Sequence, residues 1–228
     1  PEGSYVLTLV AAATDIVDSA GNPFSADVSD IWEMDTTQPT VTVEQAAEQD
    51  DPTNSLPVVF DVLFSEVVAG FAAEDVSWSG STAGGIVHET HGTDGTHFTI
   101  EVTAVATDGT LVPTIPADSA HDAAGNGNLV STFTDGTVTL DRAAPDAPTG
   151  LDLAAADDTG SATDDNTTSQ TTALTLSGLA EAESTVRLYD GAAEIASGTT
   201  AEFAAGIDVA LTGEGDHTIS ATCEDAAT

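Results

Sequence analysis

Apolar and polar residues alternate along most of the chain, and the period of this alternation is two. In PVVFDVLFSE, residues 57–66, every second side chain is apolar, and THFTIEVTAV at 96–105 repeats the pattern. Such alternation is typical of half-buried strands, and no segment sustains a helical stripe. We therefore predict an all-β chain built from β-sandwiches, with further strands in PTVTVEQ, GTVTLD, ALTLSG, STVRLYDG, GIDVALTG and DHTISATC.

A pentapeptide of the type acid–small–small–Gly–Asn occurs twice, as DSAGN at 18–22 and as DAAGN at 122–126, and EDAAT at 224–228 begins in the same way. Both complete copies lead through one strand to an acid, Asp35 or Asp141, and then to a junction that contains proline. Self-similarity at a fixed period indicates stacked copies of one unit, so we expect a piece of a longer array. The predicted units are the last two strands of a preceding repeat at 1–34, a complete sandwich at 35–141, and a second sandwich without its last strand at 142–228.

Proline and cysteine positions set two further limits. LVPTIPA places Pro113 and Pro116 where a central strand is expected, so that strand is either short or at a sheet edge. Cys223 is the only cysteine, which excludes an internal disulfide. It shares its parity with Ile219 and Ala221, and we interpret it as a small core residue.

The charge of the chain is strongly one-sided. Thirty-nine acids face two arginines, Arg142 and Arg187, and the net charge is −37. This charge argues against nucleic acid and anionic membrane as partners, because both would be repelled. No apolar run approaches the length of about 18 residues that spans a bilayer. The acids serve solubility, adaptation to high salt, or the binding of cations.

Two long stretches carry a family resemblance. DTTQPTVTVEQ, FDVLFSEVVAGFAAEDVSWSG and TIPADSAHDAAGN resemble the bacterial Ig-like repeats of giant surface adhesins, including those exported by type I secretion. APDAPTGLDLAAADDTGSATDDNTTSQTTALTLSG resembles a second subtype from the same proteins. The resemblance implies tandem seven-stranded Greek-key Ig-like sandwiches that form a long extender, often with Ca²⁺ at their junctions. FSEVV departs from the family, which prefers proline after the glutamate, and EDAAT lacks the Gly-Asn pair.

The Ig-like topology brings separate acids to one pole of the first sandwich. The loop between strands six and seven carries the pentapeptide and lies beside the linker through which the chain enters. Carboxylate, amide and carbonyl oxygens are the ligands that Ca²⁺ prefers, whereas the alternative for such a loop is plain turn chemistry. The candidate ligands at this pole are Asp35, Glu66, Asp75, Asp122 and Asn126, and Asp18 occupies the corresponding loop position in the first copy of the pentapeptide.

Two more acidic groups are candidate Ca²⁺ sites. At the next junction we expect Asp141 and Asp225 to meet Asp50 and Asp51 of EQDDPTNS. The densest cluster, AADDTGSATDDNTT, has neither the spacing nor the helices of an EF-hand, and it either binds a cation or remains a solvated acidic turn. Its candidate ligands are Asp157, Asp158, Asp164, Asp165 and Asn166.

Other site chemistry has little support in the sequence. His88 and His91 flank Glu89 in HETH, which is one residue too short for HExxH, and on a strand the two rings point to opposite faces. No Ser/His/Asp set or phosphate-binding loop has a recognisable context, so we predict a protein that is not an enzyme.

These observations favour a structural extender of a secreted or cell-surface bacterial protein, with Ca²⁺ stiffening its junctions. Its partners are then neighbouring Ig-like repeats of the same chain or of identical copies, without membrane insertion. Two alternatives stay open: a module that binds a glycan or another ligand, and a filament subunit that donates a strand to the next copy.

Overall fold

The computed structural model describes residues 2–13, 15–162 and 165–225, and these fall into two compact units. The first unit covers the chain up to residue 47 together with 57–106 and 111–137. The second unit covers 48–56, 107–110 and the chain from residue 138 onward. The boundaries predicted at residues 35 and 142 stay predictions, because the loops at 48–56 and 107–110 group with the C-terminal part of the chain.

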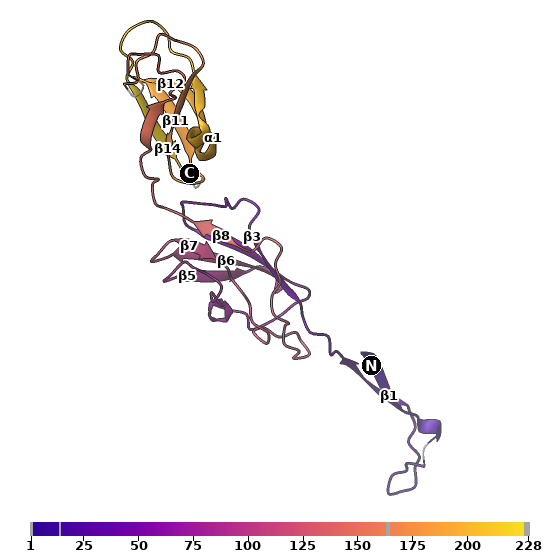
Figure 1. Cartoon of the computed structure of the whole chain (residues 1–228). Coiled ribbons are helices and arrows are strands. Elements are labelled where there is room, and N and C mark those ends of the chain that lie inside the picture. The colour runs from indigo at the N-terminus through magenta and orange to yellow at the C-terminus, as the bar shows by residue number, and fades with distance from the viewer. Residues whose placement is uncertain (1, 14, 163–164, 226–228) are drawn as a thin grey trace. The chain divides into compact units, whose positions relative to one another are not determined.

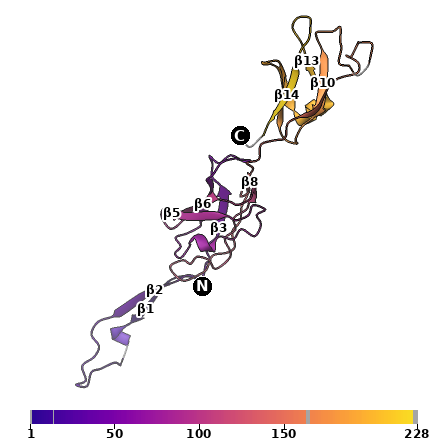
Figure 2. The same ribbon diagram turned by 90° about the vertical axis from the view of Figure 1, so that its left-hand side faces the viewer.

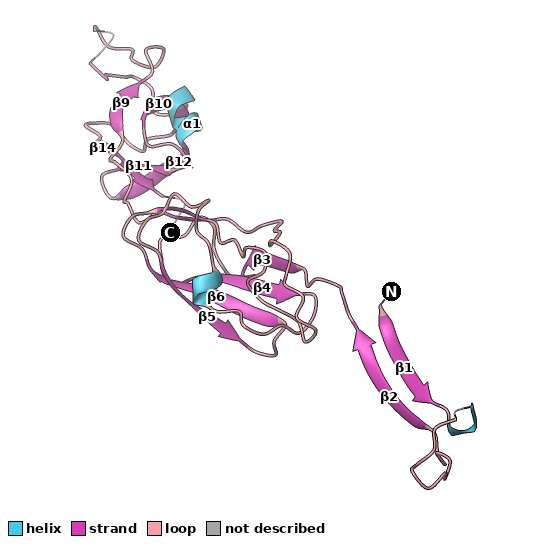
Figure 3. Cartoon of the chain, turned by 90° about the horizontal axis from the view of Figure 1, so that it is seen from below, coloured by secondary structure: helices cyan, strands magenta, loops and turns pink. Residues whose placement is uncertain are grey.

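The N-terminal part of the first unit is an antiparallel hairpin. Strand β1 (Gly3–Leu9) pairs with β2 (Val28–Met34), and the connection contains the short 3₁₀ helix η1 (Ala11–Ala13) (Figure 3). The register places Tyr5 opposite Trp32, and their rings stack with centroids 5.6 Å apart. The hairpin is a two-stranded sheet, so it buries few of its apolar side chains.

The remainder of the first unit is organised around a four-stranded antiparallel sheet in the order β3-β4-β6-β5 (Figure 1). The strands are β3 (Val41–Gln45), β4 (Val58–Phe64), β5 (Val87–Gly92) and β6 (His97–Ala104), and the 3₁₀ helix η2 (Ala73–Asp75) lies between β4 and β5. The predicted alternation is confirmed, because every second side chain of β4 is at most 2% exposed. The core side chains of this sheet are Val41, Val43, Val58, Phe60, Val62, Phe64, Ile100 and Val102.

The segment with two prolines forms only a short strand, which is one of the two alternatives predicted from the sequence. Strand β7 (Gly109–Leu111) ends before Pro113 and pairs with β8 (Val138–Leu140) in a two-stranded sheet. Thr114, between the two prolines, continues with a single antiparallel bridge to Ser77. Proline lacks the N–H that a central strand would need, which explains the early end of β7.

The second unit contains two three-stranded antiparallel sheets, ordered β13-β10-β9 and β12-β11-β14 (Figure 2). Their strands are β9 (Thr149–Leu153), β10 (Leu174–Leu179), β11 (Thr185–Asp190), β12 (Ala193–Thr199), β13 (Ile207–Val209) and β14 (Ile219–Glu224). Both sheets contribute to one apolar cluster: Leu153, Leu174, Leu176, Val186, Leu188, Phe203 and Val209. The described part of the chain is thus nearly all β, as the alternation predicts, and it is consistent with the Ig-like sandwich that the family resemblance implies.

One α-helix is present in the described part of the chain, where the sequence pattern indicates none. Helix α1 (Thr200–Ala205) begins with a capping box in which Thr199 and Glu202 bond each other's backbone N–H groups. Its Phe203 is fully buried in the apolar cluster. Six residues are too few for a visible helical stripe, but the T-x-x-E spacing is a helix-start signal.

The single cysteine is only half-buried. Cys223 shares the inner-facing parity of β14 with Ile219 and Ala221, as predicted, and its thiol donates a 2.8 Å hydrogen bond to the carbonyl of Asp146. Cys223 is therefore less buried than the predicted small core residue, because β14 is an edge strand of its sheet.

Candidate metal centre

The DAAGN pentapeptide is a tight loop closed by its own aspartate. Asp122 Oδ1 accepts 2.8 Å hydrogen bonds from the backbone N–H groups of Ala124 and Asn126, and Oδ2 accepts one of 2.8 Å from Asn126 Nδ2. Gly125 has φ +91°, a value at which a side chain would strain the backbone. The loop therefore holds the Asp122 carboxylate in one orientation, with the residue only 8% exposed.

A second segment approaches this loop from the linker that follows β2. Asn126 Nδ2 also donates a 3.2 Å hydrogen bond to the backbone carbonyl of Asp35. Gln38, three residues further on, donates through Nε2 to the carbonyl of Gly127 at 3.0 Å. Asp35 Oδ1 accepts the N–H of Thr37 at 2.9 Å, which fixes the direction of its carboxylate.

A third segment, directly after β4, brings in Glu66. The segment is attached to the pentapeptide loop by a pair of backbone hydrogen bonds between Ala69 and His121, of 2.8 and 3.0 Å. As a result, carboxylate oxygens of Asp35, Glu66 and Asp122 all lie within 4.8 Å of one another. Three acids that are separated by up to 87 positions in the sequence thus share one small volume.

The electrostatics of this trio are those of like charges held together. Burial raises the pKa of Glu66, and the negative charges of Asp122 and Asp35 raise it further. The hydrogen bond from the Asn126 side chain, followed by those from the backbone, lowers the pKa of Asp122. Asp122 is therefore more firmly ionised than Glu66, which bears the cost of the repulsion.

Neither arginine relieves this repulsion. Arg142 bonds Asp108 through its guanidinium at 2.7 Å, and Arg187 pairs with Glu194 and Glu224 at 3.3 and 3.0 Å. The chain contains no lysine. When all three groups are ionised, a cation from solution can neutralise the trio.

The donor set suits a hard cation such as Ca²⁺. Ca²⁺ takes six to eight oxygen ligands and tolerates irregular geometry, so three carboxylates, completed by carbonyls and water, provide a suitable set. The burial of the trio is graded from exposed Asp35 through half-buried Glu66 to buried Asp122. This gradient leaves water access on one side, which an ion needs in order to enter and to complete its ligand shell.

Two of the five residues predicted for this pole do not supply an oxygen to the trio. Asp75 lies outside the group, and its Oδ2 accepts the N–H of Ala72 at 2.9 Å as the cap of η2. Asn126 contacts its neighbours through the nitrogen of its amide, so it positions Asp122 and Asp35. Three of the five predicted residues thus lie together, whereas Asp75 is engaged in local capping.

Asn128 supports the pentapeptide loop and was not among the residues predicted from the sequence. This residue is fully buried. Its Oδ1 accepts the N–H groups of Ser119 and Ala120 at 2.9 and 2.8 Å, and its Nδ2 donates to the carbonyls of Pro116 and Leu129 at 2.9 and 2.7 Å. The only signal was a second Asn two positions after the pentapeptide, in GNGN.

The first copy of the pentapeptide has the same internal hydrogen bonds, but no counterparts of Asp35 and Glu66 lie beside it in the described part of the chain. Asp18 Oδ1 accepts the N–H groups of Ala20 and Asn22 at 2.8 and 2.9 Å, and Asn22 Nδ2 bonds Oδ2 at 2.9 Å. Those side-chain and backbone hydrogen bonds from Asn22 lower the pKa of Asp18. Asp18 belongs to no group of three metal-type ligands among the described residues.

Two of the acids predicted for the second junction accept hydrogen bonds from the backbone. Asp51 Oδ1 accepts the N–H of Thr139 at 2.8 Å, and Asp141 Oδ1 accepts that of Ala143 at 3.0 Å. Among the described residues, Asp50, Asp51, Asp141 and Asp225 belong to no cluster of three metal-type ligands like the trio above. Their role as ligands stays a prediction.

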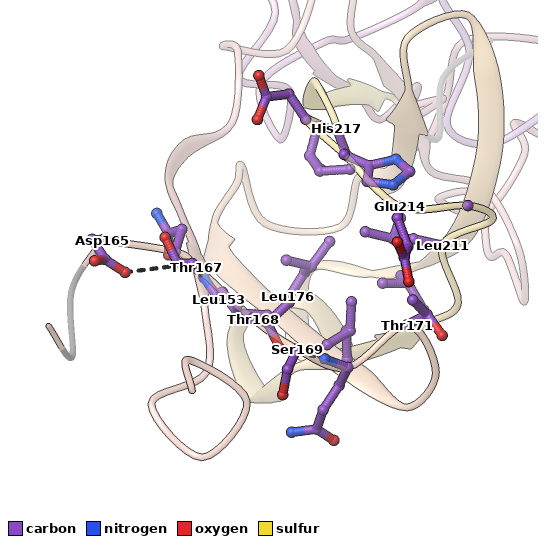
Figure 4. Close-up of a pocket in the computed structure, with 18 of the residues that line it drawn as sticks. Leu153, Asp165, Thr167, Thr168, Ser169, Thr171, Leu176, Leu211, Glu214 and His217 are labelled. Carbon is purple, nitrogen blue, oxygen red and sulfur yellow. Dashed lines mark hydrogen bonds between the residues drawn. The ribbon is translucent and has the colours of Figure 1, made fainter. Parts of the chain in front are cut away.

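Several acids in the acidic loop of the second unit accept hydrogen bonds from backbone N–H groups. Asp157 Oδ2 accepts the N–H of Thr175 at 2.9 Å, and Asp165 Oδ1 accepts that of Thr167 at 3.0 Å (Figure 4). Asp158 is 7% exposed; its Oδ2 accepts the N–H of Asn166 at 3.2 Å, whereas its buried Oδ1 has no hydrogen-bond partner. Asp164 lies outside the described residues, so the complete ligand set predicted for this loop stays a prediction.

The histidines near HETH have separate partners. His88 Nδ1 lies 3.1 Å from Trp78 Nε1, and its Nε2 lies 2.9 Å from the carbonyl of Ala73. The ring of His91 approaches Glu89 and Glu101 at 3.8 and 3.6 Å. Each ring is thus engaged by its own surroundings.

Comparison with known proteins points to the same part of the chain. Residues 35–140 match the model of a family described as bacterial Ig-like domain. No curated protein matches the sequence. The matched interval begins at Asp35 and contains the whole carboxylate trio.

Proposed function

Residues 35–140 are a bacterial Ig-like domain, and from this premise we propose that the chain is a structural extender in which Ca²⁺ stiffens the linker at Asp35. Bacterial Ig-like domains are extracellular structural or adhesive modules, and the family is typically non-enzymatic. No helix in the described part of the chain is long and apolar enough to cross a membrane. The proposed setting is a secreted or surface-anchored protein.

The observation that carries this proposal is the meeting of Asp35, Glu66 and Asp122 within 4.8 Å. Three carboxylates at this spacing repel one another, and the raised pKa of Glu66 reflects that repulsion together with burial. A divalent cation replaces the repulsion with attraction to all three groups. The acids are therefore arranged for a state in which a cation is bound.

The position of Asp35 gives the ion a mechanical role. Asp35 follows β2 directly, whereas Glu66 and Asp122 belong to loops of the Ig-like domain. An ion shared by the three would strengthen the attachment of the linker to these loops, which otherwise rests on the hydrogen bonds of Asn126 and Gln38. Because Ca²⁺ would bind this attached arrangement and not a detached linker, it would shift the population toward the stiff form.

The first test measures Ca²⁺ binding by the 228-residue chain. Isothermal titration is compared for the wild type, E66Q and D122N, with E74Q as the matched control, since Glu74 is an exposed acid on η2 outside the trio. We expect E66Q and D122N to lose the tightest site and E74Q to keep it. Equal binding by all four proteins would contradict the assignment of the trio.

The second test measures stiffness. Small-angle scattering of the wild type with Ca²⁺ and with chelator should give a larger and more narrowly distributed maximum dimension with Ca²⁺. E66Q should show the chelator profile under both conditions. Binding at the trio without any change in dimensions would leave a metal site but remove its role in extension.

A further inference from the structure

Glu2, the residue before β1, binds the linker that follows β2. Its Oε1 accepts three hydrogen bonds, of 3.2 Å from the backbone N–H of Thr36, of 2.7 Å from the Thr36 hydroxyl and of 2.8 Å from the Thr37 hydroxyl. Gly3 pairs with Met34 at the end of the hairpin, so Glu2 comes next to the start of the linker. One carboxylate oxygen of the hairpin thus fixes two successive linker residues.

These three bonds favour the ionised form of the Glu2 carboxyl. The hydrogen bonds from the Thr36 and Thr37 side chains, followed by the one from the Thr36 backbone, lower the pKa of Glu2. Hydrogen bonds to an ionised acceptor are stronger than those between neutral groups. Glu2 is therefore charged at neutral pH and accepts all three bonds in its stronger form.

Thr37 connects Glu2 with the carboxylate trio. Its hydroxyl donates to Glu2, and its backbone N–H donates to Asp35 Oδ1 at 2.9 Å. Asp35 is the exposed member of the trio, so surrounding side chains do little to hold its carboxylate. The direction of this carboxylate depends on Thr37, and the position of Thr37 depends in turn on Glu2.

The Ig-like domain holds the same linker from its other side. Asn126 Nδ2 donates to the carbonyl of Asp35 at 3.2 Å, and Gln38 Nε2 donates to the carbonyl of Gly127 at 3.0 Å. A series of hydrogen bonds therefore runs from Glu2 through the linker to the pentapeptide loop. The linker is attached to the hairpin by one end of this series and to the domain by the other.

We propose that Glu2 is a positioning residue for the carboxylate trio and couples Ca²⁺ binding there to the attachment of the β1–β2 hairpin; this rests on the Ca²⁺ site proposed above. A ligand on a loose segment binds an ion less tightly, because part of the binding free energy is used to order the segment. Glu2 orders residues 35–37 in advance, so the Asp35 carboxylate binds at a lower entropic cost. By reciprocity, an ion that holds Asp35 also stabilises the bonds to Glu2.

This coupling gives the junction two attachments of different kinds. The ion strengthens the attachment of the linker to the Ig-like domain, and Glu2 attaches the linker to the hairpin without a metal. Stiffening of the whole junction therefore needs both groups. A chain without the Glu2 carboxylate would still bind Ca²⁺, but more weakly, and the ion would no longer affect the hairpin.

Isothermal titration of the 228-residue chain with CaCl₂ measures the effect on affinity. E2A removes the acceptor oxygens, and we expect it to weaken Ca²⁺ binding by about fivefold, within the usual range of coupling between two sites. E2Q removes the charge but keeps an amide oxygen that can accept the same bonds, so it should retain most of the affinity. E33A is the matched control, because Glu33 is an exposed acid within β2, opposite Ser4, and it should bind Ca²⁺ like the wild type.

A variant that leaves every charge in place separates positioning from simple attraction of Ca²⁺ by the Glu2 charge. T36V/T37V removes the two hydroxyl donors and should weaken Ca²⁺ binding as E2A does. Simple attraction would make E2A and E2Q equally weak and leave T36V/T37V unchanged, which would overturn the proposal. Circular dichroism confirms that each variant is folded.

Hydrogen exchange of the Thr36 amide, followed by NMR, tests the bonds to Glu2 apart from the metal. In chelator this amide should exchange more slowly in the wild type than in E2A, and Ca²⁺ should slow it further in the wild type but not in D122N. Equal exchange in the wild type and E2A would overturn the proposal whether or not the trio binds Ca²⁺. If D122N abolishes Ca²⁺ binding and E2A leaves it unchanged, the role of Glu2 fails while the metal centre stands.

Discussion

The two pentapeptide loops, at 18–22 and 122–126, have the same hydrogen bonds but different neighbours. In both, one aspartate oxygen accepts two backbone N–H groups and the other accepts the asparagine amide. Around Asp122 stand Asp35 and Glu66, whereas Asp18 has no comparable group among the described residues. The pentapeptide itself is turn chemistry, and a metal centre requires the two other segments as well.

The largest loss of stability should come from substitution of Asn128. Its counterpart in the first copy of the loop, Phe24, has no comparable role. N128A leaves the N–H groups of Ser119 and Ala120 buried without acceptors, which should cost about 3 kcal/mol or more of unfolding free energy. F24A, in the half-buried counterpart, should cost clearly less. Urea unfolding of both variants, with equal slopes, checks this order. Equal losses would show that the loops are supported alike.

The next largest effect should be a stability difference between E66Q and the wild type, and its sign should depend on whether Ca²⁺ is present. In chelator, E66Q should be slightly more stable than the wild type, by about 0.5–1 kcal/mol, since one of three repelling charges is removed. In Ca²⁺ the order should invert, because only the wild type gains about 2.7 kcal/mol at a concentration of 100 Kd. Thermal unfolding under both conditions measures this. E74Q serves as the control and should show no inversion.

The pH dependence of this stability difference should identify the Glu66 carboxyl as the group responsible. The folded-state pKa of Glu66 is raised above its ordinary value of 4.5, so in chelator its ionisation destabilises the folded state at neutral pH. This penalty falls as the pH drops through the raised pKa and disappears below about 4.5. The stability difference between E66Q and the wild type should therefore shrink toward zero over this window. A difference that is independent of pH would mean that Glu66 acts through packing.

The smallest effect should be that of the first loop on the metal. D18N removes a charge from a loop with the same hydrogen bonds, but we expect the Ca²⁺ affinity at the trio to stay unchanged. D122N should abolish that affinity. Titration calorimetry of the two variants compares the loops directly. A loss of the tight site in D18N would show that the pentapeptide binds the ion by itself.

Much of the fold could be predicted because its determinants are short-range. The alternation in β4 and β6 gives both the strand and its buried face, and Pro113 limits β7 before any partner is known. Helix α1 was missed because six residues show no period, although Thr199 and Glu202 carry a capping signal. Asn128 was missed because three of its four partners lie in the segment 116–120, eight to twelve positions earlier in the chain.

For the candidate site, the sequence by itself determined the turn chemistry of Asp122, Gly125 and Asn126 and the excess of acids with only two bases. The tertiary structure decided which acids meet. The backbone pairing of Ala69 with His121 places Glu66 beside Asp122, and the bond from Asn126 to the carbonyl of Asp35 adds the linker. The physical reason is range: a turn depends on neighbouring residues, whereas the meeting of three charges depends on strand pairing between distant segments.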